Sequence, residues 1–365
     1  MCVADVIENL LGIAPESPLA RLRALRPEAT THMQGSYDAL FVNDSVTTVI
    51  RAERFAIALR VAAHHGENRT IAHYSHALRS APDGEGLVDI AGRPGSPCER
   101  VRLAAMLDHA DLLVLRPGAA VSSDIRALEA AGLDAPEIVT VSQIIAFVSF
   151  HIRVLIGLAL LRGDVPGSSG PNVGPRDATD AGFTLAQVGW SPWIEPFAAA
   201  EASDAQRAVL PGRRINSPYF RLLALDHPVL GERTATDMGI FYGQEGLPRA
   251  ERELSATVAS RVNGCIYCAS VHSRQAAQIS KRNDDVQRLL DVGIAAELDD
   301  RWRAIVDLAA ALTRTPSEAS QSHIARLRSL GLSDFEILDV IQSAAFFNWA
   351  NRLMLTLGEP VPPAG

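Results

Sequence analysis

Apolar residues recur at helical spacing along most of the chain. In the C-terminal half this spacing predicts helices at 249–263, 265–281, 301–314, 317–331 and 333–358. Asn263 and Gly264 form a stop signal after the first of these helices, and Ser333 with Glu336 forms a capping box at the start of the last. Segments in which apolar and polar residues alternate, as in a half-buried strand, are scarce. The pattern therefore predicts an all-α fold.

The same pattern occurs twice, at an offset close to 200 residues. SPLARLRAL at 17–25 matches SPYFRLLAL at 217–225, and further matches begin at Glu53 and Glu251, and at Ile125 and Ile324. A nearly constant offset over three blocks indicates two copies of one domain fused in tandem. We interpret 1–162 and 190–365 as two similar helical bundles. Residues 163–189 would link them, because 163–182 is rich in Gly, Pro, Ser and Asp and nearly free of large apolar residues.

Composition limits the classes of partner. The chain has 365 residues and a formal net charge of −8, which argues against a nucleic-acid-binding surface of clustered Lys and Arg. The longest apolar stretch, 141–161, is interrupted by His151 and Arg153, so a buried core helix is favoured over a membrane span. The N-terminus has early acidic residues and no basic region, unlike a secretory signal.

Cysteine usage points to a reducing compartment. The four cysteines are Cys2, Cys98, Cys265 and Cys268, too few for a disulfide framework in a chain of this length. We therefore expect a cytoplasmic protein. In that setting a C-x-x-C pair is redox-active or metal-binding more often than structural. Cys98 has no base nearby in the sequence, and both Cys98 and Cys2 are expected to be bystanders.

The C-x-x-C pair comes with a histidine and a glutamate at informative spacings. Cys265, Cys268 and His272 fall at i, i+3 and i+7, so they share one face of the helix expected to start at Cys265. The helix N-terminus lowers thiol pKa values there. Glu253 lies roughly 16 Å before Gly264 along the preceding helix, and His272 roughly 12 Å after it, at 1.5 Å per residue. If the two helices fold back as a hairpin, Glu253 lies level with His272.

This arrangement predicts a proton relay from Glu253 through His272 to a thiol. A carboxylate beside an imidazole orients it and raises its basicity, and the imidazole then generates a thiolate. The helix dipole favours Cys265 as the attacking thiol, whereas His272 favours Cys268. We choose Cys268 as the attacking thiol and Cys265 as the resolving one, which condenses with a sulfenic acid on Cys268 to give a disulfide. Two inert buried cysteines, or a zinc site without an obvious fourth ligand, are the alternatives.

The pattern E-x11-C-x2-C-x3-H resembles the alkylhydroperoxidase D-like branch of the carboxymuconolactone decarboxylase superfamily. The stretch VNGCIYCASVHSRQA is especially similar to its peroxidase-related members. The resemblance is strongest over 217–358 and weaker over 17–162. It implies an all-helical fold, obligate oligomers, peroxide reduction without haem or flavin, and the roles assigned above to Glu253, Cys265, Cys268 and His272. Some members carry a histidine just before the second cysteine, where this chain has Tyr267, so its relay would be shorter.

The resulting expectation is a thiol-dependent hydroperoxidase that cycles between a Cys265–Cys268 dithiol and disulfide. Its substrate would be a hydroperoxide and its electron donor a lipoyl or thioredoxin-like dithiol, with no cofactor, no bound metal, no nucleic acid and no membrane. Three fused chains would form a pseudo-hexamer; a dimer is the other homo-oligomer considered. The alternatives are a lactone decarboxylase or isomerase, as in branches that generally lack the C-x-x-C, and a non-catalytic redox-sensing or scaffold module.

The first copy lacks the reactive groups. Under the 198-residue offset, Phe55, Glu67, Thr70 and Tyr74 stand where the second copy has Glu253, Cys265, Cys268 and His272. We therefore expect the first copy to be structural. Its histidine cluster is interpreted as surface or interface histidines, with a metal site helped by Glu67 as the alternative; the cluster comprises His64, His65, His73 and His76.

Several further polar and aromatic residues have two interpretations. Asn348, Asn351 and Arg352 lie in an apolar helix, where they could line a pocket near the thiols or form packing hydrogen bonds. Trp190 and Trp193 could cover a pocket mouth, although core or interface packing is the simpler expectation.

Overall fold

The computed structural model describes residues 5–43, 46–164 and 182–362. Within these ranges every regular element is a helix except for one short two-stranded ribbon, so the predicted all-α fold is confirmed. Most of the predicted linker, and Cys2, lie outside the described residues.

The first copy contains nine α-helices and two 3-10 turns among the described residues. They are α1 (Val6–Leu11), α2 (Pro18–Arg23), α3 (Pro27–Phe41), α4 (Arg51–His65), α5 (Asn68–Ser80), η1 (Glu85–Leu87), α6 (Val88–Gly92), α7 (Val101–Leu115), η2 (Pro117–Ala119), α8 (Ser122–Ala130) and α9 (Ala135–Arg162).

The second copy repeats this order with a short lead-in and a terminal ribbon. Its elements are β1 (Gly189–Pro192), η3 (Ala199–Glu201), α10 (Asp204–Val209), η4 (Gly212–Asn216), α11 (Pro218–Leu223), η5 (Ala224–Asp226), α12 (His227–Phe241), α13 (Arg249–Asn263), α14 (Ile266–Ser280), α15 (Asn283–Val292), α16 (Asp300–Thr313), α17 (Gln321–Ser329), α18 (Asp334–Thr356) and β2 (Gly358–Val361). Strands β1 and β2 pair antiparallel, with Gly189 opposite Val361.

Local capping explains most helix boundaries. The predicted capping box is present at the start of α18, where the backbone N–H of Glu336 donates to Ser333 Oγ and Glu336 accepts from the Ser333 N–H. The start of α17 differs from the prediction, because the helix begins at Gln321 with Ser320 as its N-cap rather than at Ser317. The segment before it is tied back to α16, since both the Glu318 N–H and the Ser317 hydroxyl donate to the carbonyl of Ala311.

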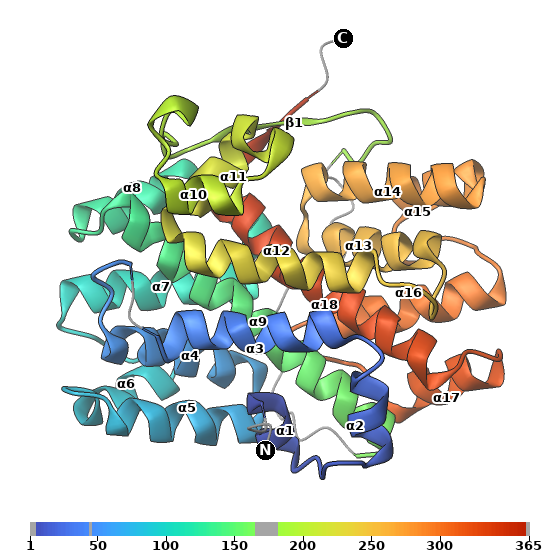
Figure 1. Ribbon diagram of the computed structural model, residues 1–365, viewed down its shortest axis with the longest axis horizontal. Coiled ribbons are helices and arrows are strands. Elements are labelled where there is room, and N and C mark those ends of the chain that lie inside the picture. The colour runs from blue at the N-terminus through green and yellow to red at the C-terminus, as the bar shows by residue number, and fades with distance from the viewer. Residues whose placement is uncertain (1–4, 44–45, 165–181, 363–365) are drawn as a thin grey trace.

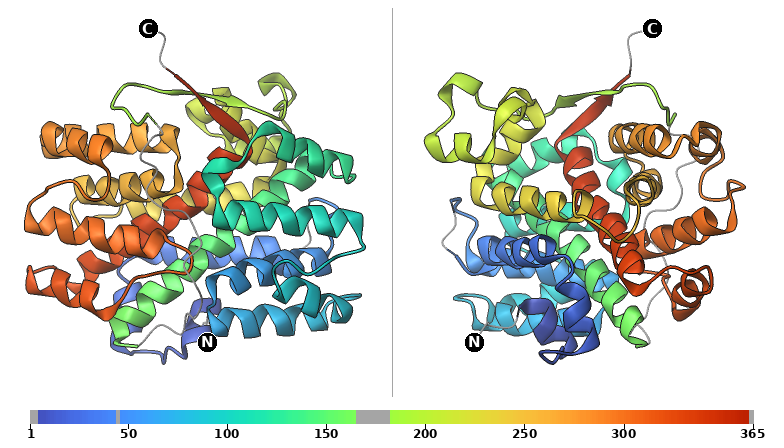
Figure 2. Two further views of the ribbon diagram at one scale, coloured as in Figure 1. Left: turned by 180° about the vertical axis from the view of Figure 1, so that it is seen from behind. Right: turned by 45° about the vertical axis from the view of Figure 1, so that its right-hand side comes forward.

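The two copies pack against each other through equivalent helices. In Figure 1, α3 and α12 lie side by side, and α9 and α18 cross at the centre of the molecule. The views in Figure 2 show most of the first copy (blue to green) and the orange helices of the second copy on opposite sides of this crossing. One hydrophobic cluster extends through both copies. The division into two domains, 1–162 and 190–365, joined by a linker at 163–189 stays a prediction.

Equivalent ion pairs support the internal repeat. In the second copy, Arg301 on α16 bridges Glu251 at 2.8 Å and Glu336 at 3.1 Å. In the first copy, Arg102 on α7 bridges Glu53 at 3.0 Å and Glu137 at 2.6 Å. Each triad ties the starts of three helices together. The two triads are related by the same offset that the sequence shows.

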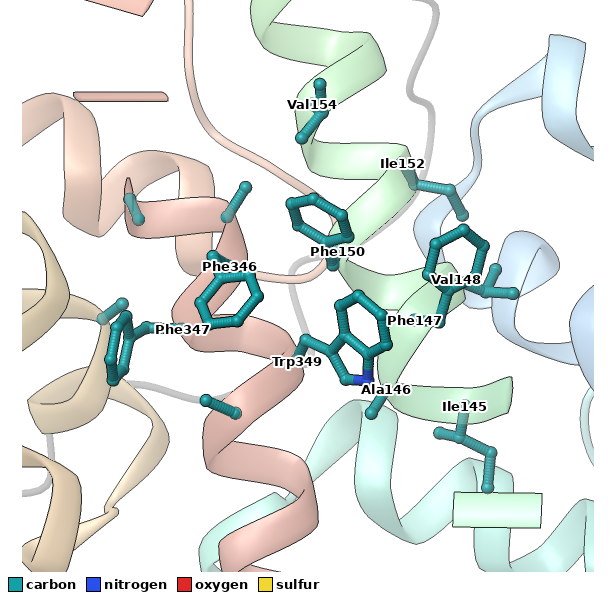
Figure 3. Packing of buried hydrophobic residues seen from close by; sticks show 14 of the residues in the cluster. Ile145, Ala146, Phe147, Val148, Phe150, Ile152, Val154, Phe346, Phe347 and Trp349 are labelled. Carbon is teal, nitrogen blue, oxygen red and sulfur yellow. The ribbon is translucent and has the colours of Figure 1, made fainter. Parts of the chain in front are cut away.

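The crossing of α9 and α18 forms the centre of the core. Figure 3 shows Phe147 and Phe150 of α9 facing Phe346 and Trp349 of α18, and the indole of Trp349 donates a hydrogen bond to Gln143 at 2.8 Å. Helix α9 is the one helix, among the described residues, that is long and apolar enough to cross a membrane, and its apolar window is entirely buried inside the protein. Core helices of non-membrane proteins meet the same criterion.

The close approach of α9 and α18 predicts a stability effect. A Cβ added at Gly157 would lie 2.3 Å from Cγ2 of Ile341, which is fully buried. We expect Gly157→Ala to lower the free energy of unfolding by about 1–3 kcal/mol, because overpacking forces the helices apart. Urea denaturation measures this value. Gly86→Ala is the control, since its Cβ would meet nothing within 4 Å. An unchanged free energy of unfolding for Gly157→Ala would contradict the packing described for the crossing.

Candidate active site

The turn between α13 and α14 positions both cysteines. Gly264 caps α13 with a left-handed backbone (φ 78°), a conformation that costs glycine little and other residues more. The chain therefore reverses, and α14 packs along α13 (Figure 1). Cys265 differs slightly from the prediction: its backbone is extended (φ −86°, ψ 91°), so it is the N-cap and the helix begins at Ile266. Cys268 lies in the first turn of α14.

The two thiols are buried but electrostatically unequal. Cys265 is 1% exposed and Cys268 is 5% exposed, and both are free. Burial, followed by its hydrogen bond to Cys268, raises the pKa of Cys265 well above the ordinary value for a thiol. Burial by itself would also raise the pKa of Cys268. The hydrogen bond from Cys265 and the charge of His272 outweigh that effect, so the pKa of Cys268 is lowered.

The carboxylate of Glu253 lies between two cationic side chains. Nδ1 of His272 donates to Oε2 of Glu253 at 2.5 Å, and Nε of Arg249 donates to Oε1 at 2.6 Å. The predicted alignment of Glu253 with His272 across the helical hairpin is therefore confirmed by their contact. Burial disfavours charge on both groups, but their mutual attraction dominates and lowers the pKa of Glu253 while raising that of His272. Because Nδ1 is engaged, Nε2 is the nitrogen left to exchange a proton with a thiol.

Aromatic rings surround the imidazole. The ring centroids of Phe347 and Phe241 lie 4.1 and 6.0 Å from that of His272. Figure 3 shows Phe347 and Trp349 on opposite sides of α18. This helix therefore directs Trp349 into the core and Phe347 toward the site. These rings shield the imidazole, whose side chain is 20% exposed, so charge interactions within the site are stronger than at the open surface.

Asn351 connects α18 to the thiols. Its Nδ2 donates to Ser260 Oγ at 3.0 Å and its Oδ1 accepts from Asn263 at 3.0 Å. Its side chain also acts on the two thiols: it contributes to the lowered pKa of Cys268 and opposes the larger rise that burial imposes on the pKa of Cys265. The sequence left open whether Asn351 lines a pocket near the thiols or forms packing hydrogen bonds. The structure favours lining of the thiol pocket.

Asn348 and Arg352 have the packing role instead. Nδ2 of Asn348 donates to Thr313 Oγ1 at 3.3 Å, and Arg352 donates to the carbonyl of Val114, in the first copy, at 3.3 Å. Arg153 of the first copy makes the reciprocal contact and donates to the carbonyl of Thr313 at 2.6 Å. These buried arginines join the two copies at the C-terminal ends of α7 and α16.

The first copy keeps the scaffold of the site without its chemistry. Phe55, Thr70 and Tyr74 are buried at the positions equivalent to Glu253, Cys268 and His272. Glu67, at the position of Cys265, is likewise an N-cap, and its carboxylate accepts from the Thr70 N–H at 2.8 Å. The first copy therefore holds neither a thiol nor a carboxylate–imidazole pair at this place.

The histidine cluster of the first copy is dispersed among separate partners. His64 donates to Asp111 at 2.6 Å, His65 accepts from Arg153 at 3.3 Å, and His73 shares a hydrogen bond of 2.8 Å with the Tyr37 hydroxyl. His76 is exposed. Across the described residues, no group of three or more His, Cys, Asp or Glu side chains is arranged to hold a metal ion.

The remaining sequence candidates lie outside the thiol pair. Cys98 is half-buried, and its thiol donates to the carbonyl of Arg100 at 3.7 Å. The indole of Trp190 donates to the carbonyl of Met354 at 3.0 Å, and Trp193 is half-buried against the core. Both tryptophans therefore pack at the start of the second copy.

A separate cavity of about 730 Å³ lies between the first copy and the far face of α12. Its lining includes Leu25, Met238 and Tyr242, but neither thiol nor His272. Because the cavity is lined by none of these reactive groups, we assign it no role in the reaction.

Sequence reasoning missed Arg249 and did not settle Asn351. Arg249 lies one helical turn before Glu253, a spacing at which opposite charges pair on a helix, so this signal was available. Asn351 comes from a helix more than 80 residues away, and only helix packing brings it to the thiols.

One comparison with known protein families matches the part of the chain that contains the site. The sequence model described as the carboxymuconolactone decarboxylase family matches residues 229–311, which include both cysteines, His272 and Glu253. A solved structure described as an uncharacterized peroxidase-related protein from Silicibacter sp. TM1040 is 30% identical, and the match covers 38% of this chain and 74% of that chain with a TM-score of 0.35. No curated protein matches the chain.

Proposed function

This chain belongs to the superfamily of the carboxymuconolactone decarboxylases and alkylhydroperoxidase D-like proteins, and we propose that it is a thiol-dependent hydroperoxidase. One observation carries the proposal: the 2.5 Å contact between His272 and a fully buried Glu253, beside a thiol pair whose pKa values are shifted in opposite directions. Paired charges of this kind, next to a nucleophile, are typical of catalytic sites. The superfamily also includes decarboxylases, and the thiol pair is the reason for favouring peroxide chemistry.

The first half of the cycle oxidises Cys268 by two electrons. The Cys268 thiolate attacks the terminal oxygen of a hydroperoxide R–O–O–H, so that an S–O bond forms and the O–O bond breaks. The electron pair of that bond leaves with the alkoxide R–O⁻. His272, whose pKa is raised by Glu253 against the effect of burial, then donates a proton to the alkoxide to give the alcohol. Cys268 is then a sulfenic acid.

The second half restores the thiols. The Cys265 sulfur attacks the sulfenic sulfur, an S–S bond forms and the S–O bond breaks. The leaving hydroxide takes up the proton that the Cys265 thiol releases and becomes water. A dithiol reductant then returns two electrons and two protons by thiol–disulfide exchange. We infer a lipoyl or thioredoxin-like dithiol as this donor and a cytoplasmic setting. These points and the homo-oligomer stay predictions.

A peroxide-consumption assay with wild-type protein tests the function. We expect one equivalent of hydroperoxide to convert Cys265 and Cys268 to a disulfide within the chain, and a dithiol donor to sustain further consumption. Peroxide loss and peptide mass spectrometry measure the two results. Consumption of a lactone acid with release of CO₂, and no thiol oxidation, would favour the decarboxylase alternative. Disulfide formation without turnover on any dithiol would favour a redox sensor.

A further inference from the structure

Two buried donors near the thiols have no hydrogen-bond partner in the described part of the chain. Nε of Arg233 and the hydroxyl of Tyr219 are buried without a hydrogen-bond partner among the described residues. Arg233 is 5% exposed and Tyr219 is 9% exposed. Burying an unpaired donor is unfavourable, because its bonds to water are lost and nothing replaces them. Both groups are therefore available to donate to a bound oxygen.

Arg233 lies on the face of α12 that borders the candidate active site. Arg233, Asp237 and Phe241 follow at intervals of four residues, so they share this face. The Phe241 ring contacts His272, with centroids 6.0 Å apart. The Arg233 guanidinium lies over the rings of Phe346 and Trp349, at 5.1 and 5.8 Å. Its charge lowers the pKa of Cys268, although burial, Cys265 and His272 have larger effects.

Tyr219 approaches the same place from α11. Its ring packs edge-on against Trp190, with centroids 5.4 Å apart, and this contact fixes the phenol beneath the β1–β2 ribbon. Burial raises the pKa of Tyr219, and the charges of Arg233, Cys268 and Cys265 act on it as well. The phenol therefore lies within electrostatic reach of the thiols and stays protonated as a donor.

The first copy provides an internal comparison. At equivalent positions Tyr219, Arg233 and Asn351 are replaced by apolar residues, which are Leu19, Met33 and Ile152. All three replacements are buried, at 7%, 3% and 0% exposure. The fold is therefore compatible with apolar side chains at these positions. The donors occur in the copy that has the thiols and are absent from the copy that lacks them.

We propose that Tyr219 and Arg233 form the subsite that binds the hydroperoxide oxygens, in particular the oxygen that leaves from the O–O bond attacked by Cys268. This assignment rests on the proposed hydroperoxidase function and deepens it. As the S–O bond forms, negative charge develops on the departing R–O⁻. The Arg233 guanidinium and the Tyr219 hydroxyl donate hydrogen bonds to that oxygen until His272 delivers its proton. Donors directed at developing charge in a dry site stabilise a transition state strongly.

Two reactions of the same thiol separate peroxide binding from thiol activation. Oxidation by hydrogen peroxide needs a site for the departing oxygen, whereas alkylation by iodoacetamide needs only the thiolate. We expect Tyr219→Phe to lower the second-order rate constant of Cys268 oxidation on the order of tenfold, with an unchanged rate constant of alkylation. Tyr37→Phe is the matched control, a buried tyrosine of the first copy that is bonded to His73. It should leave both rate constants unchanged.

Arg233 variants extend the test. Arg233→Met introduces the residue that the first copy has at this position. We expect it to lower the rate constant of oxidation more than that of alkylation. Oxidation loses both the subsite and part of the thiolate stabilisation, whereas alkylation loses only the latter. Arg233→Lys keeps the charge, so the rate constant of alkylation should return to the wild-type value. The rate constant of oxidation should stay reduced, because lysine lacks the forked donor geometry of arginine. The subsite proposal would be wrong if Tyr219→Phe and Arg233→Lys lowered the rate constants of oxidation and alkylation equally, or lowered neither. The proposed hydroperoxidase function would still stand. A wild-type Cys268 that hydrogen peroxide does not oxidise would overturn both proposals.

Discussion

Cys268→Ser is expected to abolish peroxide consumption, whereas Cys265→Ser is expected to abolish turnover only. A serine hydroxyl at position 268 stays protonated near neutral pH and cannot accept oxygen from a peroxide. Without the Cys265 thiol, Cys268 still reacts once, and its sulfenic acid accumulates because nothing within the chain condenses with it. Peroxide consumption with and without a dithiol donor, followed by trapping of the sulfenic acid and mass spectrometry, distinguishes the two variants.

The assignment of roles follows from the opposite pKa shifts of the two thiols. Burial raises the pKa of Cys265 well above its ordinary value, whereas Cys265 itself and His272 lower that of Cys268. Cys98→Ser serves as the control, since Cys98 is the other free cysteine among the described residues and contacts neither thiol. A sulfenic acid trapped on Cys265 in the Cys268→Ser variant would reverse the two roles. Unchanged peroxide consumption in Cys268→Ser would remove the peroxidase assignment.

Glu253→Gln is the variant with the second largest expected effect. Glutamine has nearly the same shape but no charge. The pKa of His272, now raised by Glu253, should therefore fall, and the imidazole should become neutral at neutral pH. Cys268 then loses the charge of His272 and its pKa should rise. We expect the peroxide rate constant at pH 7 to fall about 10²–10³-fold, within the range for loss of acid–base catalysis.

The pH dependence gives this variant its own signature. In the wild type the Cys268 thiolate should persist below the ordinary thiol pKa of about 8.5. In Glu253→Gln the ultraviolet absorbance of the thiolate should shift to higher pH, and the peroxide rate should partly recover there because the thiol then ionises unaided. Glu251→Gln is the matched control: Glu251 is also buried on α13, but it pairs with Arg301, away from the thiols. A thiolate titration unchanged in Glu253→Gln would contradict the relay.

The stability of the wild type should also depend on pH through this pair. The folded-state pKa of Glu253 is lowered, so its stabilising effect is present above the ordinary glutamate value of about 4.3 and is lost as pH falls through the folded pKa. The folded-state pKa of His272 is raised, so its effect is complete below about pH 6.5 and is lost as pH rises through the folded value. The pair stabilises the fold most between these limits.

Much of the fold and part of the site could be predicted because their signals are local. Helical periodicity, the Gly264 stop and the Ser333–Glu336 capping box depend on neighbours within a few residues, and each is present in the structure. The prediction placed the start of α17 too early for a non-local reason. The carbonyl of Ala311, in the preceding helix, accepts hydrogen bonds from Ser317 and Glu318 and holds them in a turn. A serine that precedes apolar periodicity is a good signal for a cap but does not exclude a competing tertiary contact.

The sequence by itself determined the all-helical class, the internal repeat and the alignment of Glu253 with the thiol motif, because 3.6-residue periodicity and a glycine turn fix which groups a helical hairpin brings together. The tertiary structure alone decided that Asn351 lies beside the cysteines and that Arg249 and His272 share one carboxylate. It also decided that the Tyr219 hydroxyl and Nε of Arg233 are buried without a partner among the described residues. These groups come from several helices. Their distances follow from side-chain packing between helices, which no local pattern in the sequence encodes.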